Sequence, residues 1–292
     1  KSVEVVAFCE EEGSRFLSGY LGSRYLVGQL SENALQERDA NGITVSEALQ
    51  HAGFSGKGMQ KSPQMQDIER FIELHIEQGD VLEQSGEQVG LVTSIVGLLI
   101  GKITIEGHQN HAGTTPMYLR KDPVTRAAQL ITEMNQWAMT YGEAVTCTFG
   151  EIQVFPNKSN VIAGSVSLSF DIRSTSPAIL QEAQTRIKNL QQQKDGFRYA
   201  LEFAAPDAPA QMDGGGLWLL EEAAKSLHLS YRKMHSGAGH DSQILAQKTK
   251  TNMIFIPSVG GISHSPLEYS KPDDIGHGYL LLKVFLREIA WT

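Results

Sequence analysis

Residues 165–173 read Ser-Val-Ser-Leu-Ser-Phe-Asp-Ile-Arg and predict a β-strand with one apolar face. Apolar residues from Val166 to Ile172 alternate with serine, aspartate and arginine. Successive side chains of a strand point to opposite faces of its sheet, so every apolar side chain here lies on the same face. Such a sheet buries its apolar face against helices and leaves the other face polar.

The segments around this strand follow the order of a split βαβ, or ferredoxin-like, unit. In chain order we expect a strand, a helix, two strands, a helix and a strand, over residues 100–106, 123–141, 145–154, 165–173, 177–194 and 198–203. Asp122 and Ser176 each stand directly before a proline, as N-cap residues do before a helix. We therefore expect residues 97–211 to form a lid domain of four antiparallel strands with two helices on one face.

The rest of the chain predicts a second domain of the α/β class, made of residues 1–96 and 212–292. Residues 2–8 are short, apolar and β-branched, as in a strand buried inside a parallel sheet. Residues 204–216 contain alanine-proline pairs and three successive glycines, and we expect a hinge there. After the hinge we expect a helix, a glycine-rich loop, a buried strand, a shaped loop and a closing helix, over residues 217–227, 236–241, 253–257, 260–266 and 274–289.

Composition excludes several classes of protein. The chain has 292 residues, 41% of them hydrophobic and 20% charged, which is enough for one or two ordinary cores. Its formal net charge is −8 without a basic cluster, so we expect no nucleic-acid partner. No apolar run approaches the ~18 residues of a membrane span, so we expect no membrane partner. Cys9 and Cys147 lie in strand-like runs, which favours reduced, buried thiols in a cytoplasmic protein.

Three successive glutamates, Glu10, Glu11 and Glu12, are the first candidate for a functional site. Adjacent carboxylates repel one another unless a cation or a bound proton compensates their charge. One carboxylate can then bind a cation while its neighbour stays free to accept a proton. A solvated acidic turn after a strand is the alternative interpretation.

Two isolated histidines provide the imidazole that zinc or manganese would accept beside carboxylate. His75 lies in the alternating stretch 71–77, on the polar side with Glu73 and Glu77, so pairing with one of these glutamates is an alternative. His264 follows two glycines and precedes a proline, in a loop past the end of a predicted strand. Open α/β sheets place their sites at such ends. Together with the glutamates, these histidines predict a metal-dependent hydrolase.

Three further segments could hold a polar, carboxylate-bearing substrate. Residues 111–116 and 235–241 combine imidazole, hydroxyl and backbone amides, although any turn of small residues looks similar. Arg173 could bind a carboxylate in bidentate fashion, or could pair with Asp171 or Asp122. The stretch 156–160 lies one strand earlier, and its amides could share the ligand of Arg173.

The chain resembles the allantoate amidohydrolase and N-carbamoyl-L-amino acid hydrolase branch of the M20 metallopeptidase-like family. The resemblance runs along the whole chain, and the segments that carry it are residues 10–16, 75–79, 110–117, 235–241 and 253–266. It implies an M20-type α/β catalytic domain with two divalent metal ions, zinc or manganese. It also implies an inserted ferredoxin-like α+β domain that forms a homodimer, and hydrolysis of a ureido or carbamoyl C–N bond in a small carboxylate substrate.

The resemblance implies a role for ten residues of this chain. Glu11 matches the general base. The matches to metal ligands are Glu12, His75 and His264. The matches to substrate-contacting positions are Gln78, Asn160, Arg173, Gly239 and His240. His111 matches a lid histidine that reaches the active site of the partner in such dimers.

The start of the chain departs from the family pattern. The family has a His-x-Asp segment and a further aspartate upstream of the glutamate pair, whereas here no histidine precedes His51 and no aspartate precedes Asp39. We therefore expect an N-terminally incomplete catalytic domain that binds at most one metal ion weakly and is inactive. The alternative is a non-catalytic remnant that acts as a dimerising lid or binding module. The sequence does not distinguish allantoate from N-carbamoyl amino acids as the substrate.

Overall fold

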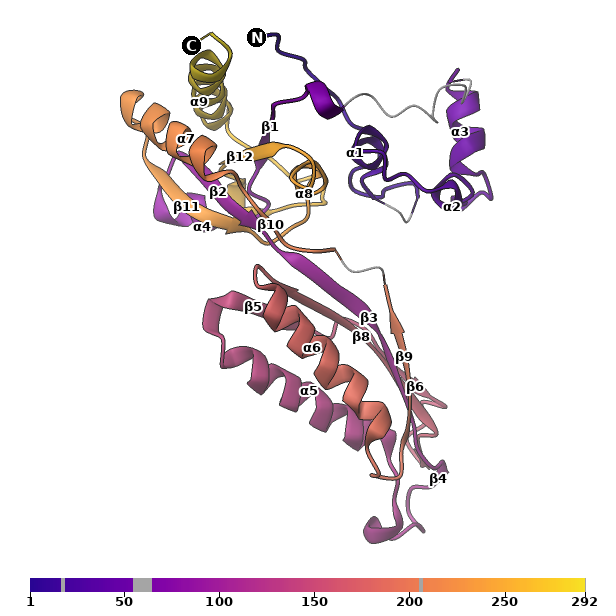
Figure 1. The fold of residues 1–292 in the computed structure, drawn as a ribbon. Helices are drawn as coiled ribbons and strands as arrows, with labels where there is room; N and C mark the ends of the chain where they lie inside the picture. The colour runs from indigo at the N-terminus through magenta and orange to yellow at the C-terminus, as the bar shows by residue number, and fades with distance from the viewer. Residues whose placement is uncertain (17–18, 55–64, 205–206, 292) are drawn as a thin grey trace. The chain divides into compact units, whose positions relative to one another are not determined.

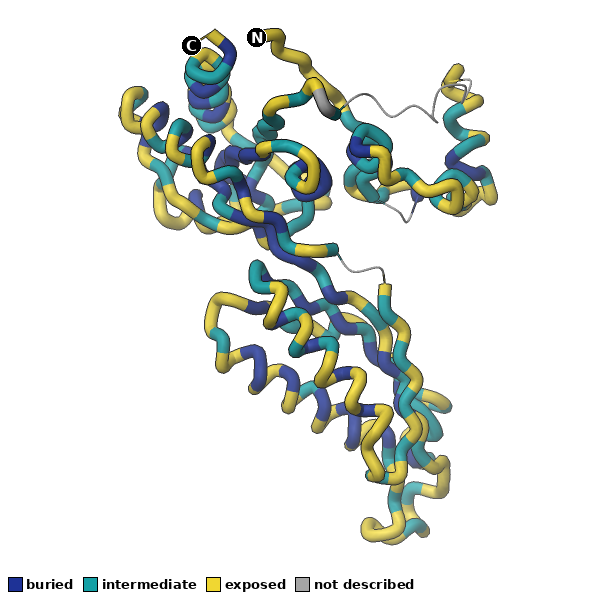
Figure 2. The backbone as a smooth tube through the Cα atoms, viewed as in Figure 1, coloured by how far each residue is buried: buried dark blue, intermediate teal, exposed yellow. Residues whose placement is uncertain are grey.

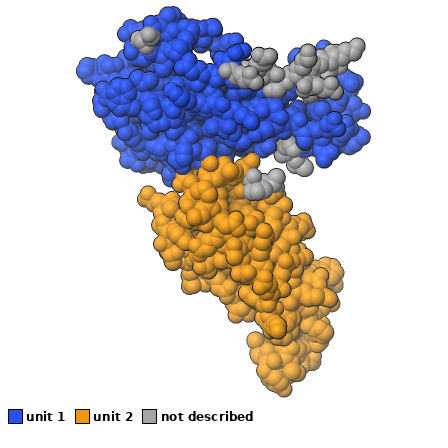
Figure 3. All heavy atoms as spheres, viewed as in Figure 1, with its two compact units in different colours: residues 1–95, 210–292 blue, residues 96–209 orange. Residues whose placement is uncertain are grey.

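The computed structural model describes residues 1–16, 19–54, 65–204 and 207–291, which form two compact units (Figures 1 and 3). Unit 1 contains Lys1–Ile95 and Ala210–Thr292, and unit 2 contains Val96–Pro209. Each unit has a mixture of helices and strands with a hydrophobic core of its own. Among the described helices, none is both long and apolar enough to cross a membrane.

Unit 2 has the predicted ferredoxin-like fold. Its sheet has the order β5-β8-β3-β9, β6 also pairs with β8, and all these pairs are antiparallel. The strands are β3 (Gly97–Glu106), β5 (Val145–Thr148), β6 (Ile152–Phe155), β8 (Ser165–Ser174) and β9 (Arg198–Phe203). Two short strands, β4 (Asn110–His111) and β7 (Val161–Ile162), form a separate antiparallel pair.

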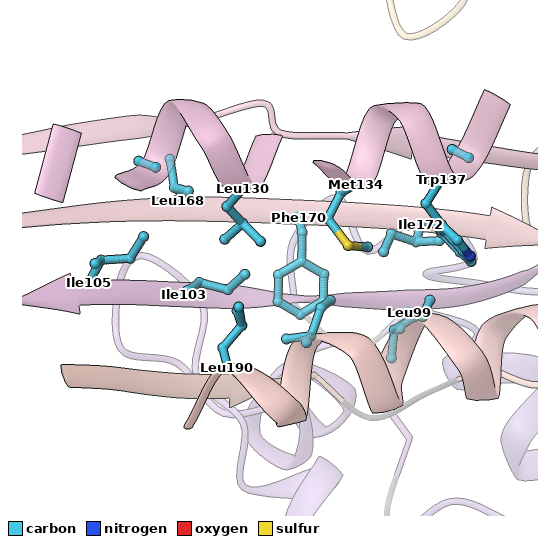
Figure 4. Packing of buried hydrophobic residues seen from close by; sticks show 14 of the residues in the cluster. Leu99, Ile103, Ile105, Leu130, Met134, Trp137, Leu168, Phe170, Ile172 and Leu190 are labelled. Carbon is cyan, nitrogen blue, oxygen red and sulfur yellow. The ribbon is translucent and has the colours of Figure 1, made fainter. Parts of the chain in front are cut away.

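Two helices cover one face of this sheet (Figure 1). They are α5 (Pro123–Met139) and α6 (Pro177–Asn189), and η2 (Met117–Leu119), η3 (Gly142–Ala144) and η4 (Leu190–Gln192) are short 3-10 turns. Asp122 caps α5 by accepting a hydrogen bond from the amide of Val124, whereas the Ser176 side chain makes no such bond to α6. Phe170 of β8 is buried between strand and helix side chains such as Leu130 and Met134 (Figure 4). The alternating pattern of residues 165–173 thus has the expected origin, because one face of β8 packs on the helices.

The expected single strand over residues 145–154 is two strands instead. Thr148 pairs with Asp171 and Ile152 pairs with Leu168. The segment that joins β5 to β6 therefore contains one residue more than the stretch of β8 that it faces. An extra residue of this kind is a β-bulge, which bends the strand and interrupts its ladder.

Unit 1 contains a mixed sheet of order β1-β12-β2-β10, with β11 also paired to β2. Its strands are β1 (Arg70–Ile76), β2 (Val89–Ile95), β10 (Ala210–Gln211), β11 (Tyr231–Ser236) and β12 (Lys250–Ile256). The pairs β1–β12 and β2–β11 are parallel, and the pairs β2–β12 and β2–β10 are antiparallel. The sheet is therefore mixed rather than the purely parallel kind that residues 2–8 suggested.

Helices cover both faces of this sheet. Leu220 of α7 (Gly214–Ser226) and Phe285 of α9 (Pro272–Ala290) are buried in one cluster with Ile254. Its neighbour Phe255 belongs to a cluster on the opposite face with Leu82 of α4 (Val81–Ser85). The remaining helices are α1 (Leu21–Leu26), α2 (Glu32–Leu35), α3 (Val45–His51), α8 (Asp241–Leu245) and the 3-10 turns η1 (Met65–Asp67) and η5 (Val259–Gly261).

The predicted strand over residues 2–8 is wrong. These residues have no regular secondary structure, and residues 2–7 are exposed (Figure 2). The relative exposure of Val5 is 97%. A strand needs a neighbour for its backbone hydrogen bonds, and within the described ranges no segment forms a ladder with residues 2–8. Cys9 is likewise exposed rather than buried, while Cys147 is half-buried on β5, and both thiols are free.

The hinge expected over residues 204–216 does not include the three glycines at its end, because α7 begins at Gly214. Gly214, Gly215 and Gly216 form the first turn of α7, where the side chain of Asp213 accepts a hydrogen bond from the Gly216 amide. A Cβ atom on Gly216 would lie 1.8 Å from the side-chain oxygen of Asn252, so close packing explains that glycine. Residues 205–206 of this segment lie outside the described residues.

Candidate functional site

Strand β1 positions Glu73 and His75 on one face of the sheet in unit 1. Ile72 and Leu74 pack with the core that contains α7 and α9, so the residues that alternate with them face the side of α8. Phe71, on that second face, packs with α8. The polar pair therefore points toward the segment that leads into α8.

The loop between β11 and α8 brings His240 to the same place. His240 is 1% exposed, and its ring centroid lies 4.5 Å from that of His75 at an interplanar angle of 66°. Glu73, His75 and His240 each offer one ligand atom, and these atoms all lie within 4.8 Å of one another. We call these residues the β1–α8 cluster.

Neighbouring groups hold each member of the β1–α8 cluster. The amide of Ser242 and its hydroxyl donate hydrogen bonds of 2.9 and 2.6 Å to Oε2 of Glu73. Nδ1 of His75 lies 2.8 Å from the carbonyl oxygen of Ile76, and Nε2 of His240 lies 2.8 Å from Oγ of Ser236. Burial, followed by the nearby His75, lowers the pKa of His240 to about 3, so this imidazole is neutral near pH 7.

Glu11 and Asp241 add acidic groups beside the cluster. Burial is the main cause that raises the pKa of Glu11 to about 8, and the carboxylates of Glu12, Asp241 and Glu73 raise it further. Burial also raises the pKa of Asp241 to about 6, against the effect of a hydrogen bond from Ser23. The crowding of carboxylates that the three successive glutamates predicted is therefore present, and it extends to residues from β1 and α8.

Glu12 and His264 lie together in unit 1. Nε2 of His264 is 3.1 Å from Oε2 of Glu12, and the side-chain amide of Gln78 donates a 3.3 Å hydrogen bond to Oε1 of Glu12. The loop that carries His264 is held by Glu268, whose Oε2 accepts hydrogen bonds from the His264 amide and the Ser263 hydroxyl. Two of the three predicted ligands thus converge, together with Gln78, whereas the third, His75, lies in the β1–α8 cluster.

Among the substrate-contacting residues implied by the resemblance, Gly239 and His240 also belong to unit 1. A Cβ atom on Gly239 would lie 2.0 Å from the hydroxyl oxygen of Tyr20, so the backbone passes too close to Tyr20 for a side chain. His240 is buried beside His75.

The other candidates lie in unit 2. His111 is exposed on β4, and its Nδ1 accepts hydrogen bonds from the amides of Gly113 and Thr114. The carbonyl of Asn160 accepts a hydrogen bond from Ala112, so the segments of His111 and Asn160 are neighbours. Arg173 on β8 makes two 2.8 Å hydrogen bonds to the carboxylate of Asp171, which is one of the ion pairs considered for it.

Sequence reasoning did not assign a role to Glu73 or Asp241. Glu73 was considered only as a partner for His75, although its position two residues earlier on an alternating strand places it on the same face. Asp241 directly follows His240, but the fold alone brings it near Glu11. Contacts between segments this far apart in sequence leave no local pattern.

The donor set of the β1–α8 cluster fits a divalent cation. Two imidazoles and a carboxylate are the ligands that zinc and related metals accept. Nδ1 of His240 is buried without a hydrogen-bond partner in the described part of the chain, which is the state of a ligand atom when its metal is removed.

Comparisons with known proteins agree with this chemistry. Allantoate amidohydrolase of Escherichia coli is 37% identical over all of this chain and 72% of its own length. N-carbamoyl-L-amino-acid amidohydrolase of a Pseudomonas species is 38% identical over 96% of this chain and 70% of its own length. The crystal structure of a hydantoinase/carbamoylase family amidase from Burkholderia multivorans matches with a TM-score of 0.83 at 32% identity, over 95% of this chain and 68% of that one.

These matches support the expected family. They do not bear out the expectation that this chain lacks part of its catalytic domain or is inactive. The family model for peptidase family M20/M25/M40 matches residues 1–288. This chain therefore belongs to peptidase family M20/M25/M40.

Proposed function

We propose that this protein is a metal-dependent amidohydrolase that cleaves a ureido or carbamoyl C–N bond in a small carboxylate substrate. The observation that carries the proposal is the position of Glu11 near Glu73, a carboxylate that lies with two histidines in the β1–α8 cluster. The names of the relatives, allantoate amidohydrolase and N-carbamoyl-L-amino-acid amidohydrolase, supply the class of bond.

Glu11 is the general base of the proposed reaction. Its carboxylate stands among acidic groups that favour its protonated form. Bound cations would compensate this negative charge and favour the ionised carboxylate, which could then accept a proton from a water molecule and release it to the leaving nitrogen. Divalent cations, when bound, would polarise the substrate carbonyl and make water easier to deprotonate. Glu12, His75 and His264 would hold metal, and zinc or manganese suits these ligands.

Each unit has polar groups that we propose as substrate contacts. Gln78 donates a hydrogen bond to Glu12. Gly239 has no side chain, so its backbone amide would be the group that contacts a substrate. In unit 2, Arg173 carries the planar guanidinium that pairs with a carboxylate in bidentate fashion. Asn160 and the exposed His111 complete the set, with His111 acting across a homodimer formed by unit 2. The cytoplasm is the expected location of such a metabolic enzyme.

Turnover of two substrate classes tests the proposal. The purified chain, first treated with a chelator, would be supplied with Mn²⁺ or Zn²⁺ and then with allantoate or an N-carbamoyl-L-amino acid. We expect ammonia release that requires metal and is lost in Glu11→Gln, whose amide cannot accept the proton. Metal-independent release, or equal release from Glu11→Gln, would contradict the proposal.

A further inference from the structure

We propose that Ser258 and Glu83 are positioning residues of the proposed site. They hold two neighbouring loops so that Gln78 and His264 stay in contact with Glu12. Neither Ser258 nor Glu83 has a role in the pattern that the family resemblance implies. The inference deepens the proposed function, on which it rests for the roles of Glu12, Gln78 and His264.

The carboxylate of Glu12 is held from two sides. The side-chain amide of Gln78 donates a 3.3 Å hydrogen bond to Oε1, and Nε2 of His264 lies 3.1 Å from Oε2. Nearly half of the Glu12 side chain is exposed, so packing alone does not fix its rotamer. The positions of Gln78 and His264 therefore determine where this carboxylate points.

Both partners of Glu12 have an unusual backbone conformation. Gln78 has a φ of 59° and His264 has a φ of 55°, in the left-handed region that residues other than glycine rarely adopt. Such a conformation costs free energy and persists only where the surrounding structure holds it. Each of the two residues therefore needs contacts from its surroundings to keep its side chain on Glu12.

The loops that carry these two residues leave the sheet side by side. Residues 77–80, the first loop, follow β1, and residues 257–271, the second loop, follow β12. Strands β1 and β12 are parallel neighbours, so both loops begin at the same edge of the sheet. The amide of Gln78 donates a 3.1 Å hydrogen bond to Oγ of Ser258, which is 1% exposed. Ser258 in the second loop thus holds the backbone of Gln78 in the first.

The two loops also pack tightly against each other. A Cβ atom on Gly261 would lie 2.9 Å from the backbone nitrogen of Asp80, and Gly261 has a φ of 63°. Glycine at this position permits both the close approach and the left-handed backbone. A displacement of one loop is therefore felt by the other, because packed backbones leave no space to absorb it.

Glu83 of α4 ties the second loop to the helix that follows the first. Its Oε2 accepts a 2.6 Å hydrogen bond from the amide of Gly260, and its Oε1 lies 3.5 Å from Nζ of Lys271. A hydrogen bond to an ionised carboxylate is about twice as strong as one between neutral groups. Glu268 holds the amide of His264 within the second loop, whereas Glu83 fixes that loop relative to α4.

NMR of the full chain tests the assignment without turnover. The chelator-treated protein would carry ¹⁵N in its glutamine and histidine side chains. Glu12→Ala would show where the Nε2 resonances of Gln78 and His264 lie once their partner is gone. We expect Ser258→Ala to move the Gln78 resonance toward this position, and Glu83→Ala to move that of His264.

Two further variants serve as matched controls for Glu83→Ala. Lys271→Ala removes the ion pair of Glu83 but keeps its hydrogen bond to Gly260. Glu83→Gln keeps a side-chain oxygen that can accept this hydrogen bond. We expect both variants to retain the wild-type resonances. Circular dichroism of each variant shows whether it has kept its fold, and the partly exposed Glu83 provides a test if the buried Ser258 variant has not.

Turnover measures the consequence for the proposed reaction. We expect Ser258→Ala and Glu83→Ala each to lower kcat/KM by at least about tenfold, as loss of a group that orients a ligand does. Lys271→Ala should stay within about threefold of the wild type, because an exposed ion pair contributes little. In a Gln78→Ala background, Ser258→Ala should lower kcat/KM no further, because it acts through Gln78.

Three results would overturn the proposal. The first is that both resonances keep their wild-type positions in Ser258→Ala and Glu83→Ala. The second is a shift in Lys271→Ala as large as in Glu83→Ala, because the ion pair would then hold the loop. The third is a further loss of kcat/KM from Ser258→Ala in the Gln78→Ala background, which would give Ser258 a structural role alone. Since the NMR result does not require turnover, a wild-type chain without activity would contradict the proposed function and still leave the positioning roles decided.

Discussion

Nε2 of His264 lies 3.1 Å from Oε2 of Glu12, so a loop near the end of the chain contacts the glutamates near its beginning. The side chains of His264 and Glu12 are 66% and 48% exposed. Ion pairs this exposed to water contribute about 1 kcal/mol or less to stability, so the contact between His264 and Glu12 matters little for folding. It places two predicted metal ligands at hydrogen-bonding distance.

Replacing Glu12 with glutamine should therefore separate function from stability. We expect the midpoint of thermal unfolding to move by no more than about 3 °C, because the pair is exposed. We expect turnover to fall by at least about a hundredfold, since a metal ligand is lost. Calorimetry and the ammonia assay measure the two effects, and wild-type turnover in Glu12→Gln would remove Glu12 from the site.

Arg173 and Asp171 offer a matched pair of substitutions in unit 2. Both side chains are about one-third exposed, and Arg173 donates two hydrogen bonds to Asp171. Either Arg173→Ala or Asp171→Asn breaks the pair, so both should lower stability equally, by about 1 kcal/mol or less. Only Arg173→Ala should also raise KM, by about tenfold or more, because it alone removes a carboxylate-binding group. Unchanged kcat and KM in Arg173→Ala would show that Arg173 serves the ion pair alone.

Cys147 should make stability depend on pH in the alkaline range. Burial, assisted by the negative charge of Asp171, raises the pKa of this thiol from 9.0 to about 11. Because the folded protein holds the thiol proton more tightly than the unfolded chain, this contribution is complete below the unfolded value of 9.0 and is lost as pH rises to about 11. The free energy of unfolding of the wild type should fall more steeply over this range than that of Cys147→Ser. Parallel slopes in urea titrations of the two proteins would contradict the raised pKa.

The core of unit 2 should be sensitive to a single truncation. Phe170 is 1% exposed and packs against Phe203 with a ring separation of 5.6 Å. Phe170→Ala should lower the free energy of unfolding by about 3–5 kcal/mol, because it removes apolar contacts and leaves a cavity. Ile152 is 56% exposed on β6, and Ile152→Ala should cost no more than about 1 kcal/mol. Urea unfolding of both variants checks the difference, and similar losses would mean that Phe170 is not central to the core.

Local patterns predicted unit 2 well because its elements carry their own signals. The alternation in residues 165–173 indicates one buried face, and this face is the one that packs on α5 and α6. Asp122 before Pro123 marks the start of α5, and its side chain forms the expected cap. The bulge between Thr148 and Ile152 was missed because it depends on register with β8, which the sequence of one strand does not contain.

Unit 1 shows where such patterns fail. Residues 2–8 have the composition of a buried strand. Such a segment forms a strand only when another strand lies beside it, and composition does not show whether one does. The glycines at 214–216 indicated a flexible link, but close packing against Asn252 explains Gly216 within a helix. In the site, Glu11, Glu12, His75 and His264 were found as separate candidates. The grouping of His240 with His75 and Glu73 comes from the packing of the segment before α8 against β1, which the sequence of neither segment contains.

Metal-dependent turnover by the purified 292-residue chain tests the central claim most directly. With Mn²⁺ or Zn²⁺ restored after chelation, we expect ammonia release from allantoate or from an N-carbamoyl-L-amino acid. Glu11→Gln should reduce kcat by about a hundredfold or more while leaving Co²⁺ binding in place, as loss of a general base predicts. Metal-bound, folded protein that releases no ammonia from either substrate class, or a Glu11→Gln variant with wild-type kcat, would contradict the account.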